Sequence, residues 1–149
     1  MKNTRHKTNK KGFTMIEMIA VMVVVAVILS AVLPSLIGAI NNSRVSSAAG
    51  TIRSLQTAAA NYYNANGGSY TGLSIATLAS GNYLPAGITG TDSWNGTITV
   101  APDANASWFD ITLTNVPTAQ ATALTAQVAN LVQAIPTYTA ASQTWKAAF

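Results

Sequence analysis

The sequence predicts an α+β protein in which a long N-terminal helix packs on a small antiparallel sheet with one additional helix. Three observations support this fold. Residues 13–40 form an almost unbroken apolar run, apolar residues then recur at helical spacing as far as residue 62, and two short alternating segments follow near residues 96–113. We expect three parts: a basic segment at 1–12, an apolar helix at 13–41, and a globular head at 42–149 that includes the amphipathic half of the helix.

The charge of the chain is concentrated at its start. Only 8% of the 149 residues are charged, while 49% are hydrophobic. From Phe13 onward the chain has three basic and four acidic residues, so its basic pI comes from the first segment. No nucleic-acid partner is therefore evident for the rest of the chain. Cysteine is absent, which excludes disulfides and thiolate-bound metal. The five basic residues before Gly12 are Lys2, Arg5, Lys7, Lys10 and Lys11.

The apolar run is long enough to cross a membrane. Met18 to Ile40 spans roughly 35 Å as a helix, which exceeds the hydrocarbon core of a bilayer. Lysines and arginines flank only its N-terminal side, so that end is expected to stay in the cytoplasm while the rest crosses outward.

The helix is expected to continue beyond the apolar run with a different pattern. Its apolar residues then lie on one stripe, which predicts that this half packs against the rest of the head. We expect one helix from about Thr14 to about Asn64, closed by Asn66-Gly67-Gly68. The stripe consists of Val45, Ala48, Ile52, Leu55, Ala59 and Tyr62.

The remaining residues predict short elements around that helix. A short helix is expected at 73–79 with Ser74 as its N-cap, and strands at 96–101 and 109–113 are expected to form a hairpin through the turn at 102–105. Pro117 should open another helix that ends at Pro136, with one face made of Leu124, Val128, Leu131 and Ile135. The alternation of Trp145, Ala147 and Phe149 predicts an edge strand.

The junction at residues 10–17 carries the most specific pattern, Lys10-Lys11-Gly12-Phe13-Thr14-Met15-Ile16-Glu17. It resembles the processing site of type IV pilins and pseudopilins, in which a basic stretch and a glycine precede a hydrophobic residue with a glutamate four positions later. A sole carboxylate at the start of a spanning segment is rare, because it costs about 2.5–3.5 kcal/mol at mid-bilayer. The resemblance continues through the apolar run to Pro34.

The resemblance implies a sequence of events and partners. A prepilin peptidase would cut after Gly12 and methylate the amine of Phe13, and Glu17 would act in subunit assembly. The precursor would sit in the inner membrane with its N-terminus cytoplasmic, and the inner-membrane pilus assembly machinery would build a homopolymer outside the cell. Physical reasoning agrees for Glu17, because a charge in hydrocarbon needs a partner and the new amine of an adjacent subunit supplies one.

Pro34 predicts a local disturbance of the helix. Proline has no N–H and its ring clashes with the carbonyl of Ser30, so it kinks or loosens the helix there. A tolerated kink in a membrane span is the simpler reading. In the pilin family the matching region is often unwound within the filament, and Gly38 one turn later would help.

Several alternatives remain open at this point. A secretory signal peptide fits poorly, because the run exceeds 7–15 residues and contains Glu17; an ordinary signal anchor is the other alternative. The head resembles type IVb-like major pilins but lacks their cysteine pair, whereas the short leader and Phe13 resemble type IVa. We therefore expect the major pilin of a type IV pilus, with a pseudopilin of type II secretion or a monomeric membrane-anchored binding module as alternatives. The sequence does not indicate whether such a filament serves adhesion, motility, DNA uptake or secretion.

Other sites are weakly indicated. No nucleophile is flanked by the lone His6, and the carboxylates are scattered, so no enzyme, cofactor or metal site is predicted. Asn105 opens an Asn-x-Ser sequon preceded by Asp103, a form favoured by some bacterial oligosaccharyltransferases, and is a weak candidate for glycosylation. The tyrosines and tryptophans are expected to serve in the core and in interfaces.

Overall fold

The structure is a computed structural model that describes residues 12–105 and 107–149. The chain divides into two compact units, of which the first ends at Ala39 and the second comprises Ile40–Phe149. Most of the basic segment, including Lys10, Lys11 and His6, lies outside the described residues. The elements in chain order are α1 (Met15–Ala65), α2 (Ile75–Ser80), β1 (Ile98–Pro102), β2 (Phe109–Leu113), α3 (Thr118–Val128), β3 (Thr137–Thr139) and β4 (Thr144–Ala148).

Helix α1 has the bounds that the sequence predicts, within one residue at each end. Its C-terminus is closed by a backbone motif in which Asn66 N–H donates to Tyr62 O (2.8 Å) and Gly68 N–H donates to Tyr63 O (2.9 Å). Gly67 lies in the left-handed region with a φ of 67°, a conformation that glycine adopts without a Cβ penalty. The predicted Asn66-Gly67-Gly68 stop is therefore confirmed.

The first unit consists of the apolar part of α1, and its side chains are exposed on all sides of the helix. The two serines in this stretch bond within the helix: Ser30 Oγ donates to Val27 O and Ser35 Oγ donates to Val32 O, each at 2.8 Å. Because these hydroxyls are satisfied locally, neither needs water or a neighbouring chain. α1 is long and apolar enough to cross a membrane.

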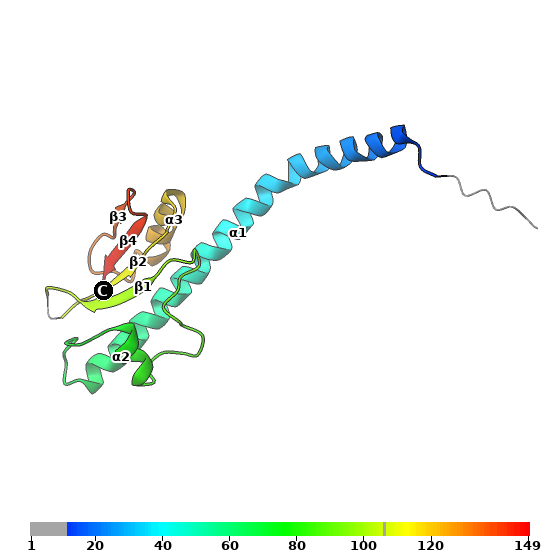
Figure 1. The fold of residues 1–149 in the computed structure, drawn as a ribbon. Helices are drawn as coiled ribbons and strands as arrows, with labels where there is room; N and C mark the ends of the chain where they lie inside the picture. Colours follow the sequence, from blue (N-terminus) through cyan, green and yellow to red (C-terminus); the bar gives the residue numbers. More distant parts are fainter. Residues whose placement is uncertain (1–11, 106) are drawn as a thin grey trace, which may run out of the picture. The chain divides into compact units, whose positions relative to one another are not determined.

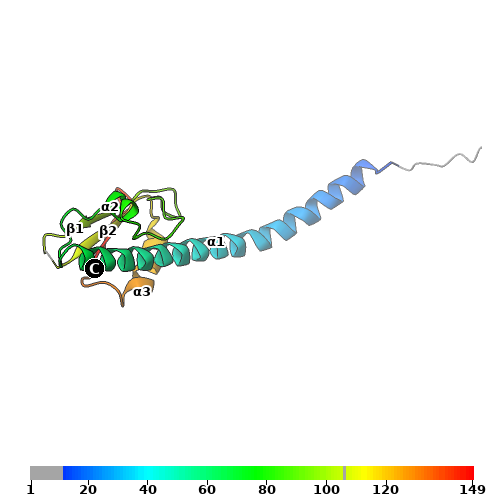
Figure 2. The ribbon, with the colours of Figure 1, turned by 90° about the horizontal axis from the view of Figure 1, so that it is seen from below.

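The second unit is built on the amphipathic half of α1, and its core confirms the predicted stripe. Figures 1 and 2 show this half of α1 beside α3, and a side-chain hydrogen bond joins them, with Arg53 Nη2 donating to Gln127 O at 3.4 Å. The buried stripe contributes to one hydrophobic core with the inner face of the sheet. Its fully buried members are Val45, Ala48, Ala49, Ile52, Leu55, Ala58 and Ala59.

The sheet has four antiparallel strands in the order β1-β2-β4-β3 (Figure 1). β1 and β2 form the predicted hairpin, with Val100 paired to Ile111. The prediction that the last strand lies at an edge is wrong. β4 pairs with β2 on one side and with β3 on the other, so β3, a three-residue strand that the sequence did not reveal, is the edge strand on that side of the sheet. The inner position explains why Trp145 is fully buried.

The segment between α1 and β1 is held by local polar contacts. Ser74 caps α2 as predicted, since Thr77 N–H donates to Ser74 Oγ (3.1 Å) and Ser74 N–H donates to Thr77 Oγ1 (2.8 Å). Further on, Asp92 Oδ1 accepts from Trp94 N–H (2.8 Å) and Gly96 N–H (2.6 Å), which fixes the turn that leads into β1.

Helix α3 starts after Pro117 as predicted but is shorter than expected. It ends at Val128, and Leu131 N–H donates to Val128 O (2.8 Å) in a turn. The chain then pairs with the sheet, because Gln133 N–H donates to Ala148 O (2.9 Å). Because these residues pair with β4, the helix does not continue to Pro136. Ile135 is therefore 88% exposed and does not lie on a buried helix face.

Candidate assembly site

The N-terminus of α1 is held by a reciprocal pair of contacts between Thr14 and Glu17. Thr14 N–H donates to Glu17 Oε2 (2.7 Å), and Thr14 Oγ1 donates to the same oxygen (2.9 Å). In return Glu17 N–H lies 3.3 Å from Thr14 Oγ1, which accepts from it. This is a capping box, in which the Thr-x-x-Glu spacing satisfies backbone donors at the start of a helix.

The capping box gives Glu17 a role that the sequence reasoning missed. The Thr14-Met15-Ile16-Glu17 spacing carries the signal for this cap in the sequence, whereas the sequence analysis predicts for Glu17 only a pairing with the Phe13 amine of an adjacent subunit. Within the described residues, the contacts of its carboxylate all fall on Oε2, so Oε1 is open to a further donor. The carboxylate is thus oriented at the first turn of the helix, where the helix dipole also favours negative charge.

The residues at the predicted cleavage point are accessible. Gly12 has no atom within 4 Å of the position that a Cβ would occupy, and Phe13 is 84% exposed. Both precede the first residue of α1, so the backbone between them is not part of the helical hydrogen-bond ladder. Phe13 and Glu17 therefore lie at the same end of the helix, on either side of Thr14.

The helix is continuous at Pro34. α1 carries the proline inside its length without an interruption, and Gly38 has open space around it. Because Pro34 has no N–H, the Ser30 carbonyl lacks its usual helical donor. The unwinding expected near Pro34 concerns a subunit inside a filament, whereas this structure is of a single chain. The unwinding therefore stays a prediction.

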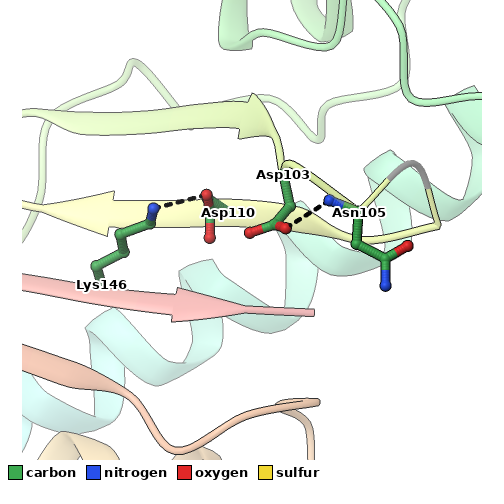
Figure 3. A network of polar contacts seen from close by, with 4 residues as sticks. All are labelled: Asp103, Asn105, Asp110 and Lys146. Atoms are coloured by element: carbon green, nitrogen blue, oxygen red, sulfur yellow. Dashed lines mark hydrogen bonds and ion pairs between the residues drawn. The ribbon is translucent and has the colours of Figure 1, made fainter.

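The hairpin turn that holds Asn105 is stabilised by its own side chains. Asp103 Oδ1 accepts from Asn105 N–H (2.8 Å), and Asn105 Oδ1 accepts from Ser107 N–H (3.2 Å). Figure 3 shows the Asn105 side chain pointing away from the Asp110–Lys146 pair on the neighbouring strands. Asn105 is exposed.

Potential metal ligands and surface hollows were compared across the described part of the chain. It contains no group of three or more His, Cys, Asp or Glu side chains that could hold a metal ion. Two hollows on the head, of about 170 and 270 Å³, lie on either side of Ile135 and are lined mainly by alanine, threonine and aliphatic side chains.

An exposed apolar helix that opens with an oriented carboxylate, followed by an α+β head, defines the class of type IV pilin-like proteins. Comparison with family models agrees on both parts. The model described as "Prokaryotic N-terminal methylation motif" matches residues 7–33, and the model described as "PilS N terminal" matches residues 42–145. The second match covers more than half of the chain, so the chain belongs to this pilin family. Comparison with curated proteins gave no match.

The family assignment has direct consequences. The methylation motif implies processing by a prepilin peptidase and assembly into pili. The pilin-family matches point to a structural protein rather than an enzyme. The candidate transmembrane helix and the leader motif are consistent with a membrane-anchored precursor that later enters a pilus.

Proposed function

We propose that this protein is the major subunit of a type IV pilus, cleaved after Gly12, methylated at the amine of Phe13, and polymerised through its apolar helix. The observation that carries the proposal is the apolar half of α1, which is exposed on all sides yet opens with a single oriented carboxylate. Water is a poor solvent for such a surface, so lipid covers it in the precursor and other copies cover it in the polymer.

The precursor stage follows from the charge distribution. The basic segment before Gly12 keeps the N-terminus in the cytoplasm, and the head crosses the inner membrane. Cleavage removes the basic residues and creates a new amine at Phe13. The partners at this stage are the prepilin peptidase, which also acts as the N-methyltransferase, and the inner-membrane assembly machinery.

Glu17 then sets the axial register of subunits. Thr14 donates two hydrogen bonds to Oε2, which offsets part of the cost of taking the carboxylate out of water. The open Oε1 accepts from the amine of Phe13 on an adjacent subunit, and the methyl group leaves that amine basic. A charged pair buried among apolar helices stabilises only if both members are present, so it discriminates between registers.

Pro34 and Gly38 give the helix a place to extend in the polymer. In lipid each unsatisfied backbone group costs several kcal/mol, so the helix of the precursor stays largely intact. Neighbouring helices in a filament can satisfy those groups, which permits a break between about Val27 and Gly38. A filament density map with uninterrupted α-helix from residue 14 to residue 40 would refute this part and leave the polymer proposal in place.

A second candidate function and a modification site are also proposed. A pseudopilin of a type II secretion system shares the methylation motif and the same assembly helix, and is the second candidate. Glycosylation of Asn105 is proposed on its sequon and its exposed position at a turn. A monomeric binding module is disfavoured because the head carries few charged side chains and exposes an Ala-, Thr- and Ser-rich surface that suits repeated self-packing.

Electron microscopy of sheared cell-surface material tests the proposal. Cells that express Glu17→Ala should insert and cleave the protein but yield at least about tenfold fewer filaments, because an unmatched amine is then buried in the polymer. Glu17→Gln keeps a hydrogen-bond acceptor for Thr14 and separates capping from charge; it should assemble as poorly as Glu17→Ala. Filament yields like those of the wild type from Glu17→Ala cells would show that the charged pair is dispensable.

A further inference from the structure

The charged side chains of the head are separated along the length of α1. The head holds three basic and three acidic side chains, so it has no net side-chain charge. Arg44 lies near the start of the amphipathic half of α1 and is exposed. Within the described residues the side chain of Arg44 makes no ion pair or hydrogen bond, whereas that of Arg53 is held against α3 through Gln127 O.

The acidic side chains of the hairpin form a cluster with one negative charge in excess. Asp110 Oδ2 lies 2.7 Å from Lys146 Nζ, and Asp103 lies nearby on the turn between β1 and β2 (Figure 3). The hydrogen bond that Lys146 donates to Asp110 raises the pKa of Lys146, and the charge of Asp103 adds to that effect. Lys146 neutralises one of the two carboxylates, so Asp103 keeps an unmatched charge with Oδ1 bonded to Asn105 N–H.

Aromatic contacts place this cluster at the far end of the head from Arg44. Pro102 and Phe109 pair across the hairpin next to Asp103, and the ring of Phe109 lies 5.0 Å from that of Tyr70. Tyr70 in turn lies 4.7 Å from Tyr63, in the last turn of α1. Arg44 precedes Tyr63 by nineteen residues of the same helix, or about 28 Å.

We infer that, in the polymer, the guanidinium of Arg44 on one subunit pairs with the carboxylate of Asp103 on a second copy of this chain. The inference rests on the proposed function, because polymerisation through the apolar helices displaces successive heads along α1. That displacement brings the Arg44 end of one head over the Asp103 end of another. Every precursor has the same membrane orientation, so the contact is head-to-tail, and a head-to-tail contact propagates into a filament instead of closing into a dimer.

The pairing has a specific energetic role. An exposed ion pair contributes little to stability by itself and weakens with salt. The ion pair instead favours one axial offset between neighbouring heads. At any other offset, the guanidinium of Arg44 faces basic or uncharged side chains of the neighbouring subunit. Arg also offers a planar fork that binds a carboxylate through two parallel hydrogen bonds.

Crosslinking tests the contact directly, because the native chain contains no cysteine. Cells should co-express an Arg44→Cys chain and an Asp103→Cys chain, and their filaments should be treated with a short thiol–thiol crosslinker. We expect linked dimers in the mixed filaments at least several-fold above either chain alone. A link within one chain is excluded, because each variant chain carries a single cysteine. Replacing Arg44→Cys by Arg53→Cys provides the control, and that mixture should give background levels.

Charge exchange covers the case in which cysteine variants do not assemble. Arg44→Asp and Asp103→Arg should each reduce filament yield at low salt, and the double variant should restore most of it. Filaments whose mixed crosslinking stays at background, or a double variant no better than the single ones, would overturn the contact. A wild-type chain that is processed but forms no filament would instead overturn the proposed function, so the two failures are distinguishable.

Discussion

The two halves of α1 form one helix but differ in how their side chains are covered. Between residues 15 and 39 the apolar side chains are exposed all round, although this half is the more hydrophobic one. Between residues 40 and 65 seven side chains are buried, and four of them are alanines. The difference teaches that the arrangement of apolar residues around the helix, more than their number, decides what covers a helix in the folded chain.

That arrangement separates intramolecular from intermolecular partners. A stripe of apolar residues fits one neighbour, and the head supplies it through the inner face of the sheet. A helix that is apolar all round needs partners on every side, which a head of this size does not provide. Lipid and other copies do, so the apolar half is expected to matter for insertion and assembly and to leave the stability of the head nearly unchanged.

The largest predicted contrast comes from one substitution made in each half. Leu55 is fully buried, and Leu55→Ala should destabilise the head by about 2–5 kcal/mol because it leaves a cavity. Leu29 is 49% exposed, and Leu29→Ala should change head stability by less than about 0.5 kcal/mol. Denaturant unfolding of the full chain in detergent micelles, followed by tryptophan fluorescence, measures both. Equal effects of the two substitutions would remove the distinction between the halves.

An intermediate effect is predicted where the turn at Asp92 meets the hairpin. A Cβ at Gly96 would overlap the backbone carbonyl oxygen of Thr114, so Gly96→Ala should destabilise the head by about 1–3 kcal/mol. Gly50 in the head half of α1 is the matched control. It has no atom within 4 Å of its Cβ position, and Gly50→Ala should stabilise the helix by about 0.5–1 kcal/mol. The same unfolding measurement should give opposite signs for these two variants, and a shared sign would contradict the packing.

The smallest predicted effect concerns the ion pair on the outer side of the sheet. Lys146 has a raised pKa because it is hydrogen-bonded to Asp110, so its contribution is complete below the ordinary value of 10.5. The contribution disappears as the pH rises through the raised value. Lys146→Gln should cost about 0.5–1 kcal/mol at neutral pH, since Lys146 is half exposed, and should reduce the loss of stability above pH 10.5. An unchanged alkaline profile in Lys146→Gln would show that other groups cause that loss.

The sequence was sufficient for elements defined by local chemistry. The stripe in α1, the glycine stop after Ala65, the Ser74 cap and the β1–β2 hairpin all follow from spacing and turn residues. Local patterns did not reveal which segments far apart in the sequence pair in the sheet. The periodicity of Leu131 and Ile135 suggested more helix, whereas the backbone of Gln133 pairs with Ala148 of β4.

The candidate site was predicted in part for a similar reason. The motif from Lys10 to Glu17 predicts a processing point after Gly12 and a functional carboxylate at Glu17. The spacing of Thr14 and Glu17 also predicts their capping box. The sequence analysis treats Glu17 as a charge in lipid and does not include these local hydrogen bonds. The ion pair of Asp110 and Lys146 joins two different strands, and only the folded sheet brings these two side chains together.

Mass spectrometry of the N-terminus of the subunit in sheared filaments tests the central claim most directly. We predict a chain that begins at Phe13 and carries one methyl group on its amine. Gly12→Trp should leave the full precursor in the membrane, because a large side chain then occupies the position that Gly12 leaves open. A filament subunit that begins at Met1, or at any residue beyond Ser30, would contradict the claim that this chain is a processed pilin.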